Sequence, residues 1–320
     1  MVDLQQRHAV AQAGAAAPAL HTVELAKRYG RTVALAGLSM TVPRGEVFGF
    51  LGPNGAGKTT AVKLLLGLTR PTAGEAWLLG HPLHDRAVRR GVGYLPELFR
   101  YQPWLSAREV LGVHCRLLGL PRATWKEEID AVLRTVGLAG RDREKVRNFS
   151  KGMQQRLGIA VALLGSPELV LLDEPTSALD PVGRHDVREI IRSLRERGTA
   201  VFLNSHLLTE VEMVCDRVAM VERGRVIATG TLDELLGGGA CRLRVTGLQP
   251  ADRAGLASFG AAGGAFEDDG EWIVVRGLDP DRVPDVVEAV VRLGGRVHAV
   301  EPRQQTLEDR FLELLRQEQG

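Results

Sequence analysis

The sequence predicts an α/β fold with a mostly parallel sheet, followed by a second, smaller α+β domain. In the longer first part, short apolar runs alternate with amphipathic stretches of helical period, which favours strands with helices packed on both faces. One apolar run ends in a glycine-rich loop that leads into a helix. The three consecutive glycines 237–239 then interrupt the pattern, and a new series of strands and helices begins after them.

The first part opens with β-branched stretches on either side of the turn residues Gly30 and Arg31, which predicts two strands. From about residue 98 to residue 165 the pattern is helical, so we expect a helical subdomain there. We expect strands at 22–29, 33–42, 46–51, 169–172 and 200–203, and helices at 59–66, 107–119, 125–136, 152–164 and 183–197.

The second part, residues 240–320, has the order βαββαβ followed by one more helix, which predicts a small ferredoxin-like domain. The expected strands are 241–245, 265–268, 271–276 and 296–300, and the expected helices are 251–258, 280–293 and 306–316.

Composition excludes several classes of protein. The 320 residues contain 41 basic and 39 acidic residues, so the net charge of +2 creates no strong field, and we expect no nucleic-acid partner. The three cysteines have no pairing or metal-ligand spacing, which fits a reducing cytoplasm. We expect the alanine-rich residues 1–19 to form a disordered tail. No run reaches the roughly 18–20 apolar residues that span a bilayer, so any membrane part should belong to another chain.

The strongest motif is the segment Gly52-Pro-Asn-Gly-Ala-Gly-Lys-Thr59, which matches the P-loop pattern G-x-x-x-x-G-K-[ST]. Its glycines allow backbone N–H groups to converge on phosphate oxygens, and the following helix presents its positive N-terminus. Lys58 supplies a charge for the β- and γ-phosphates, and the Thr59 hydroxyl is a ligand suited to Mg²⁺. We therefore expect Mg-ATP to bind here and to be hydrolysed. The expected nucleotide contacts in this loop are Gly52, Pro53, Asn54, Gly55, Ala56, Gly57, Lys58, Thr59 and Thr60.

A second motif follows the apolar run 169–172, which ends in Asp173 and Glu174. A strand ending in a carboxylate places Asp173 at the carboxyl edge of the sheet, where it can hold Mg²⁺. Glu174 points to the other side and can orient and deprotonate an attacking water. An apolar run followed by acids is weak evidence alone, but it becomes strong together with the P-loop.

A third segment, residues 149–156, places Ser150 and Gly152 at the start of a helix. A hydroxyl and free N–H groups at this point make either an anion site or an ordinary N-capped helix. The segment itself leaves both interpretations open.

The ordered set of motifs resembles the ATPase subunit of an ATP-binding-cassette (ABC) transporter, over about residues 20–237. Within this resemblance Tyr29 matches the aromatic that stacks on adenine, and residues 93–97 match the loop that joins the core to the helical subdomain. Residues 149–156 match the signature motif, residues 177–180 match the loop that crosses the dimer interface, and His206 matches the switch histidine.

The resemblance implies a RecA-like P-loop NTPase fold and a head-to-tail homodimer that encloses two ATP molecules. Each ATP would lie between the P-loop of one chain and Ser150 and Gly152 of the other. Glu174 would act as the general base and His206 would hold the γ-phosphate and the water. Asp180 would lie at the dimer contact. Thr59, Glu97 and Asp173 would be the Mg²⁺ ligands.

Three residues depart from the family pattern. Glu97 stands where glutamine is usual, which puts the coupling geometry in doubt but not ATP binding. Lys151 and Met153 replace the usual glycine and glutamine of the signature, while Ser150 and Gly152 are kept. The extra charge of Lys151 would raise the affinity for ATP in the closed dimer.

The signature variant, Glu97 and the C-terminal segment 301–312 together resemble one subgroup, the ATPase subunits of ABC-2-type exporters, which includes daunorubicin-resistance members. The segment also fits a generic amphipathic helix. Aromatic residues concentrate in 98–104, where they either pack between subdomains or form a groove for a short helix of a transmembrane permease.

This resemblance implies a cytoplasmic protein, peripheral on the inner face of the cell membrane. The alternatives are an importer ATPase with a regulatory C-terminal domain and a soluble ABC ATPase of translation or DNA repair. The transported substrate and the role of the C-terminal domain are not encoded in any motif.

Overall fold

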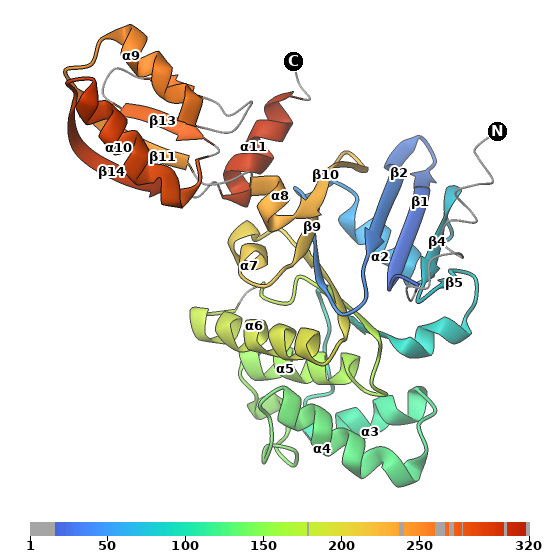
Figure 1. Cartoon of the computed structure of the whole chain (residues 1–320). Coiled ribbons are helices and arrows are strands. Elements are labelled where there is room, and N and C mark those ends of the chain that lie inside the picture. The colour runs from blue at the N-terminus through green and yellow to red at the C-terminus, as the bar shows by residue number, and fades with distance from the viewer. Residues whose placement is uncertain are drawn as a thin grey trace. The chain divides into compact units, whose positions relative to one another are not determined.

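The computed structural model describes residues 17–177, 179–236, 240–259, 266–268, 272–276, 278–303 and 306–317. The chain divides into two compact units, Met1–Thr229 and Gly230–Gly320 (Figure 1). Residues 1–16 of the expected tail lie outside the described residues. Ala19, which we assigned to that tail, is fully buried and donates its backbone N–H to Val42 O, so the packed region already includes it.

The first unit is built on one ten-stranded sheet with the order β5-β4-β1-β2-β10-β9-β3-β8-β7-β6. Its strands are β1 (Leu20–Tyr29), β2 (Thr32–Val42), β3 (Val47–Leu51), β4 (Ala73–Leu78), β5 (His81–Pro82), β6 (Val92–Leu95), β7 (Leu169–Asp173), β8 (Ala200–Ser205), β9 (Arg217–Glu222) and β10 (Arg225–Thr231).

The sheet is mixed, not mostly parallel as we expected. Strands β9, β3, β8, β7 and β6 pair in parallel, whereas β2, β1, β4 and β5 pair antiparallel. The turn at Gly30 and Arg31 explains the difference, because two strands joined by so short a connection can only run antiparallel.

Strand β3 lies in the middle of the parallel part, and all five of its residues are buried. Its two phenylalanines, Phe48 and Phe50, lie with their ring centroids 6.2 and 5.2 Å from that of Phe202 in β8. A strand that is covered on both faces needs such a continuous apolar run. The loop that follows β3 is therefore anchored in the best-packed part of the unit.

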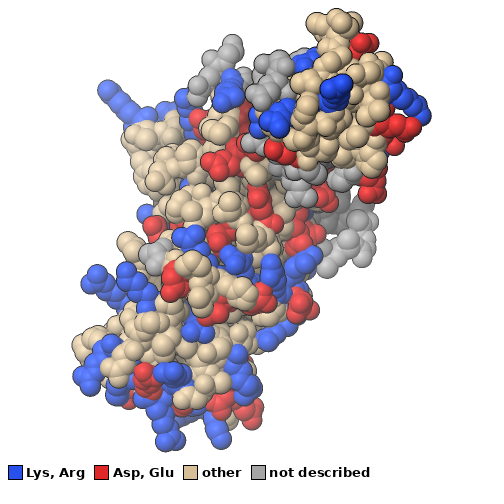
Figure 2. Space-filling model, turned by 90° about the vertical axis from the view of Figure 1, so that its left-hand side faces the viewer, with Lys and Arg blue, Asp and Glu red and all other residues tan. Residues whose placement is uncertain are grey.

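The helices of the first unit are α2 (Lys58–Leu65), α3 (Ala107–Leu117), α4 (Trp125–Thr135), α5 (Lys151–Ala162), α6 (Pro181–Glu196) and α7 (Leu208–Glu212). Helices α3, α4 and α5 contact one another and form the helical subdomain (Figure 1). Arg108 of α3 joins Asp130 of α4 to Asp142 through its guanidinium. On the face shown in Figure 2, basic and acidic side chains are interspersed, in keeping with the nearly neutral net charge.

The second unit contains an antiparallel sheet with the order β12-β13-β11-β14. In chain order this is 2-3-1-4, the ferredoxin-like arrangement that the sequence predicted. Apolar side chains on one face, among them Leu243, Ile273 and Val286, form its core. The elements are α8 (Leu232–Leu236), β11 (Ala240–Thr246), α9 (Pro250–Gly255), β12 (Phe266–Asp268), β13 (Trp272–Arg276), α10 (Val283–Arg292), β14 (Arg296–Arg303) and α11 (Leu307–Gln317).

Every strand and helix that we expected is present, with ends displaced by a few residues. The pattern did not reveal β4, β5, β6, β9, β10, α7 or α8, which are short or lie outside the apolar runs. In particular, Gly93–Leu95 belong to β6 and not to a connecting loop, so only Pro96 and Glu97 extend beyond that strand.

Candidate nucleotide-binding site

The P-loop joins the end of β3 to the start of α2, and its glycines are required by their surroundings. A Cβ at Gly52 would lie 2.3 Å from the carbonyl oxygen of Val221, and one at Gly57 would lie 2.3 Å from that of Ala34. Gly57 also has a φ of 99°, which side chains rarely adopt. Gly55 has a φ of 86° and open space around it. The loop can therefore approach a ligand with its backbone alone.

Lys58 places its ammonium group inside this loop. The side chain is buried, and Nζ donates to Gly52 O at 2.6 Å and to Pro53 O at 3.3 Å. Burial lowers the pKa of Lys58, while the carboxylates of Glu174, Asp173 and Glu97 act in the opposite direction. Positive charge is thus held at the point where a phosphate bound by the loop would lie.

Asp173 ends β7 next to β8, and its carboxylate is almost fully buried. Asn204 of β8 donates from Nδ2 to Asp173 Oδ1, and Asn204 Oδ1 is buried without a hydrogen-bond partner among the described residues. Burial raises the pKa of Asp173; the Asn204 hydrogen bond lowers it, and the nearby charges of Glu97 and Glu174 raise it further. A nearby cation would favour the ionised form of this carboxylate.

Glu174 is held in a strained conformation immediately after β7. Its φ is +52°, which non-glycine residues seldom adopt, and its N–H donates to Asn204 O. His206 Nδ1 lies 2.8 Å from Glu174 Oε2, but the two groups are not aligned for a hydrogen bond. Among the described residues, Glu174 Oε2 therefore keeps its capacity to accept a proton or a hydrogen bond.

The donor groups at this edge fit a magnesium ion. Thr59 is exposed at the start of α2, and Glu97 follows β6, the parallel neighbour of β7 that carries Asp173. Among the described residues no group of three or more histidines, cysteines or acids is arranged to hold a metal alone. Mg²⁺ binds one or two carboxylates and takes its other ligands from phosphates and water.

Four of the predicted residues lie outside this cluster. Tyr29 is exposed at the end of β1, with Lys27 Nζ 4.8 Å from its ring centroid. Ser150 caps α5 by accepting from Met153 N, with Gly152 in the first turn, and Asp180 caps α6 by accepting from Gly183 N. Their hydrogen bonds are local, so the fold of one chain leaves Ser150 and Asp180 available for another partner.

Asn204 was not predicted from the sequence. The available signal was the order of residues after the apolar run Ala200–Leu203, where Asn204, Ser205 and His206 follow one another at the carboxyl end of a strand. Strand β8 lies between β3 and β7, so these residues reach the same edge as the P-loop and Asp173.

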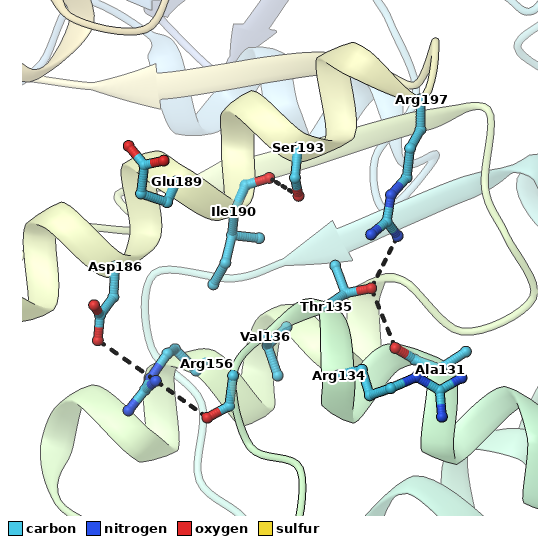
Figure 3. A pocket seen from close by; sticks show the side chains of 11 residues that line it. Ala131, Arg134, Thr135, Val136, Arg156, Asp186, Glu189, Ile190, Ser193 and Arg197 are labelled. Carbon is cyan, nitrogen blue, oxygen red and sulfur yellow. Dashed lines mark hydrogen bonds and ion pairs between the residues drawn. The ribbon is translucent and has the colours of Figure 1, made fainter.

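The first unit also has a cavity that lies away from this edge of the sheet. A cavity of about 490 Å³ lies between α4, α5 and α6, and its walls include Thr135, Arg156 and Arg197 (Figure 3). Arg197 donates to Thr135 Oγ1, and Arg156 lies 3.4 Å from Asp186. None of the predicted nucleotide contacts lines it, so we assign the site from the edge of the sheet and not from the size of this cavity.

The comparisons with known proteins agree with this geometry. The family model described as ABC transporter matches residues 35–177. An ABC transporter ATP-binding protein of Nostoc sp. is 42% identical over 290 residues, which are 90% of this chain and 85% of the relative. The chain belongs to the ABC transporter ATP-binding family. Members of this family bind ATP, and membership implies ATPase activity coupled to transport.

Two relatives of this ATP-binding subunit have names that state a transported compound. The bacitracin transport ATP-binding protein of Bacillus licheniformis is 40% identical and covers 68% of this chain and 71% of its own length. The Nod factor export ATP-binding protein I of Rhizobium etli is 36% identical over 91% of each chain.

Solved structures confirm the fold of the first unit. A structure of an ATP-binding subunit of an ABC transporter has 33% identity and a TM-score of 0.61, and it covers 68% of this chain and 91% of its own. That of cbiO1 from Clostridium perfringens, part of an ABC transporter complex, has 28% identity and a TM-score of 0.62 over 68% and 90%. ABC ATP-binding subunits work with a transmembrane permease. In the described part of this chain, no helix has the length and apolar composition of a membrane span.

Proposed function

We propose that this subunit hydrolyses Mg-ATP to ADP and phosphate and thereby drives an ABC-2-type exporter of the daunorubicin-resistance-like subgroup. The observation that carries the hydrolysis is the cluster of Lys58, Asp173, Glu174 and His206 at the carboxyl edge of β3, β7 and β8. The names of the bacitracin and Nod factor relatives favour export over import. On this proposal the chain lies in the cytoplasm, bound to a permease at the inner face of the membrane.

The residues divide the chemistry among them. Backbone N–H groups of the P-loop and the Lys58 ammonium bind the phosphates, and the exposed ring of Tyr29 stacks on adenine. Thr59 and Asp173, with Glu97, would hold Mg²⁺, which would neutralise charge on the phosphates. Glu174 Oε2 accepts a proton from the attacking water, and His206 stabilises the carboxylate and the γ-phosphate.

Two copies of the chain complete the site. Ser150 is exposed at the N-terminus of α5, where its hydroxyl accepts a hydrogen bond from Met153 N within the first turn of the helix. A helix N-terminus with a hydroxyl and an adjacent glycine is suited to a phosphate. We therefore infer a head-to-tail homodimer in which Ser150 and Gly152 of one chain contact the ATP held by the other, with Asp180 at the contact.

The Glu174→Gln variant tests both the role of Glu174 as the base and the ATP-dependent homodimer. The variant keeps the size of the side chain but loses the base, so ATPase activity is expected to fall at least 100-fold while ATP still binds. Light scattering with ATP present should then report a dimer, because the hydrolysis that separates the two chains is blocked. Normal turnover would contradict the role of Glu174, and a monomer at saturating ATP would contradict the dimer.

The structure separates the aromatic residues of 98–104 into two groups. Phe99 packs on α5, where a Cβ at Gly158 would lie 2.6 Å from its ring, and the Tyr101 ring contacts that of Phe99 in a tilted arrangement with centroids 5.3 Å apart. Leu98 and Trp104 are instead 87% and 65% exposed. We propose that Leu98 and Trp104 contact the permease, while Phe99 and Tyr101 support the surface beneath them.

Trp104→Ala is expected to remove most coupling of ATPase activity to transport while the isolated subunit keeps its normal ATPase rate. The reason is that an exposed interface tryptophan contributes mainly to binding of the partner. The measurement is transport and ATPase activity of the complex with its permease in vesicles. Val182→Ala, an exposed apolar residue on α6, is the control. An equal loss of both activities would indicate misfolding instead.

A further inference from the structure

Helix α7 is too short to hold its own position. It has five residues, Leu208–Glu212, it begins two residues after His206, and its N-cap residue Leu207 makes no side-chain capping bond. Isolated helices of this length are not stable in water. The place of α7, and of the histidine just before it, must therefore be set by its tertiary contacts.

One side of α7 packs on the strand that carries the P-loop. Val211 is fully buried, and a Cβ at Gly49 of β3 would lie 2.7 Å from Val211 Cγ1. This contact brings the two elements close, but an apolar contact of this kind has no strong directional preference. It does not by itself determine how far α7 is shifted along the strand.

The other side of α7 is joined to α6 by a buried ion pair. Arg188 Nη1 donates to both carboxylate oxygens of Glu210, at 3.0 and 2.9 Å. The two side chains are only 17% and 9% exposed. One turn further along α6, Arg192 donates to the backbone oxygen of Met213 at 3.1 Å, just after α7. Arg188 and Arg192 of α6 thus both contact the segment that follows His206.

A buried ion pair contributes little net stability compared with apolar side chains of the same volume, because desolvation offsets the attraction. What it does provide is direction, since a charged hydrogen bond is strong only over a narrow range of geometries. We propose that the Arg188–Glu210 pair positions His206 against Glu174 by holding α7 on α6. The inference rests on the catalytic role proposed above for His206.

The first test compares Arg188→Met with Arg195→Met, a control on the same helix that removes a more exposed ion pair with Asp216. Arg188→Met is expected to lower kcat for ATP about tenfold, because a small displacement of an active-site group is costly. KM for ATP should change less than about twofold, since the P-loop and Lys58 are untouched. Arg195→Met should have the rate of the unmodified protein. An equal fall in kcat for both variants would overturn the proposal.

A double-mutant cycle with His206→Ala distinguishes positioning from general damage. If Arg188 acts through His206, the Arg188→Met/His206→Ala variant is no slower than His206→Ala alone. If the fold losses in kcat of the two single variants multiply in the double variant, the positioning role of Arg188 is overturned and the proposed function is unaffected. A normal kcat for His206→Ala would instead remove the proposed role of the histidine, and this inference with it.

Arg188→Met leaves a buried carboxylate without its partner and can unfold the protein. The second variant is therefore Arg188→Met/Glu210→Leu, which fills the same volume with apolar groups. We expect it to melt at the temperature of the unmodified protein and to retain the lowered kcat. Recovery of kcat together with stability would show that the pair serves packing only, and would overturn the proposal.

Discussion

The two units of the chain differ in what they bury. Among the described residues, every buried polar or charged side chain belongs to the first unit, and most of them lie at the carboxyl ends of β7 and β8 or in the segments that follow β3, β7 and β8. The buried residues of the second unit are apolar. Burying polar groups is unfavourable unless they are paired. The buried polar groups at one edge of the sheet therefore lower the folding stability of the first unit. These buried polar residues are Thr22, Lys58, Ser106, Asp173, Glu174, Thr176, Asn204, Ser205 and Glu210.

This difference shows where the chemistry of the chain is concentrated. Asp173 is paired with Asn204 in the register of β7 and β8, Glu174 follows Asp173 directly, and the charges of both acids raise the pKa of Lys58 against the effect of burial. The core of the second unit, by contrast, consists of apolar side chains packed on its four-stranded sheet. Substitutions inside the two units should accordingly have different consequences.

The largest effect is expected from Lys58→Ala. Removing the ammonium inside the P-loop should weaken ATP binding at least 100-fold, because no other cation of the described residues donates into that loop. Isothermal titration calorimetry measures the affinity. Lys63→Ala, an exposed lysine on the same helix, is the control. An unchanged ATP affinity of the Lys58→Ala variant would contradict the assignment of this edge of the sheet as the nucleotide-binding site.

An intermediate effect is expected from Leu243→Ala in the second unit. Leu243 is fully buried in an apolar core, so the loss should be about 2–5 kcal/mol of unfolding free energy. Chemical denaturation measures this loss. ATP affinity of the folded protein should stay unchanged, because no buried polar group of the site lies in that unit. A parallel loss of ATP affinity under folding conditions would contradict the division of roles.

The smallest effect is expected from Asp173→Asn, and it is a gain in stability. Burial raises the pKa of Asp173, so the ionised carboxylate opposes folding at neutral pH. Removing the charge should stabilise the nucleotide-free protein by about 1 kcal/mol, a rise in Tm of about 2–4 °C. The ATPase rate should fall at the same time.

The pH dependence of the stability gain of Asp173→Asn tests whether the charge of Asp173 is its cause. The destabilisation by Asp173 is fully present above its raised folded-state pKa and disappears as pH falls below its ordinary value of 3.8, where both states are protonated. The difference in Tm between the two proteins should therefore shrink between neutral and acidic pH. A difference that is constant over this range would show that charge is not its cause.

The sequence by itself determined the local parts of this protein. The P-loop between β3 and α2 was predictable because strand, turn and helix N-terminus are adjacent in the chain and carry a single contiguous motif. The carboxylates after β7 were predictable because an apolar run that ends in two acids reads as a strand ending at the edge of a sheet. The ferredoxin-like order of the second unit followed in the same way from the alternation of its elements.

Only the tertiary structure decided which distant residues meet. The contacts of Asn204 with Asp173 and of His206 with Glu174 exist because β8 pairs beside β7. The Arg188–Glu210 pair exists because α6 packs against α7. Sequence periodicity reports which face of an element is apolar, but strand order and helix packing depend on long-range burial that no local pattern encodes. For the same reason the sequence did not distinguish the aromatic residues Phe99 and Trp104; only the fold packs Phe99 against α5 and leaves Trp104 exposed.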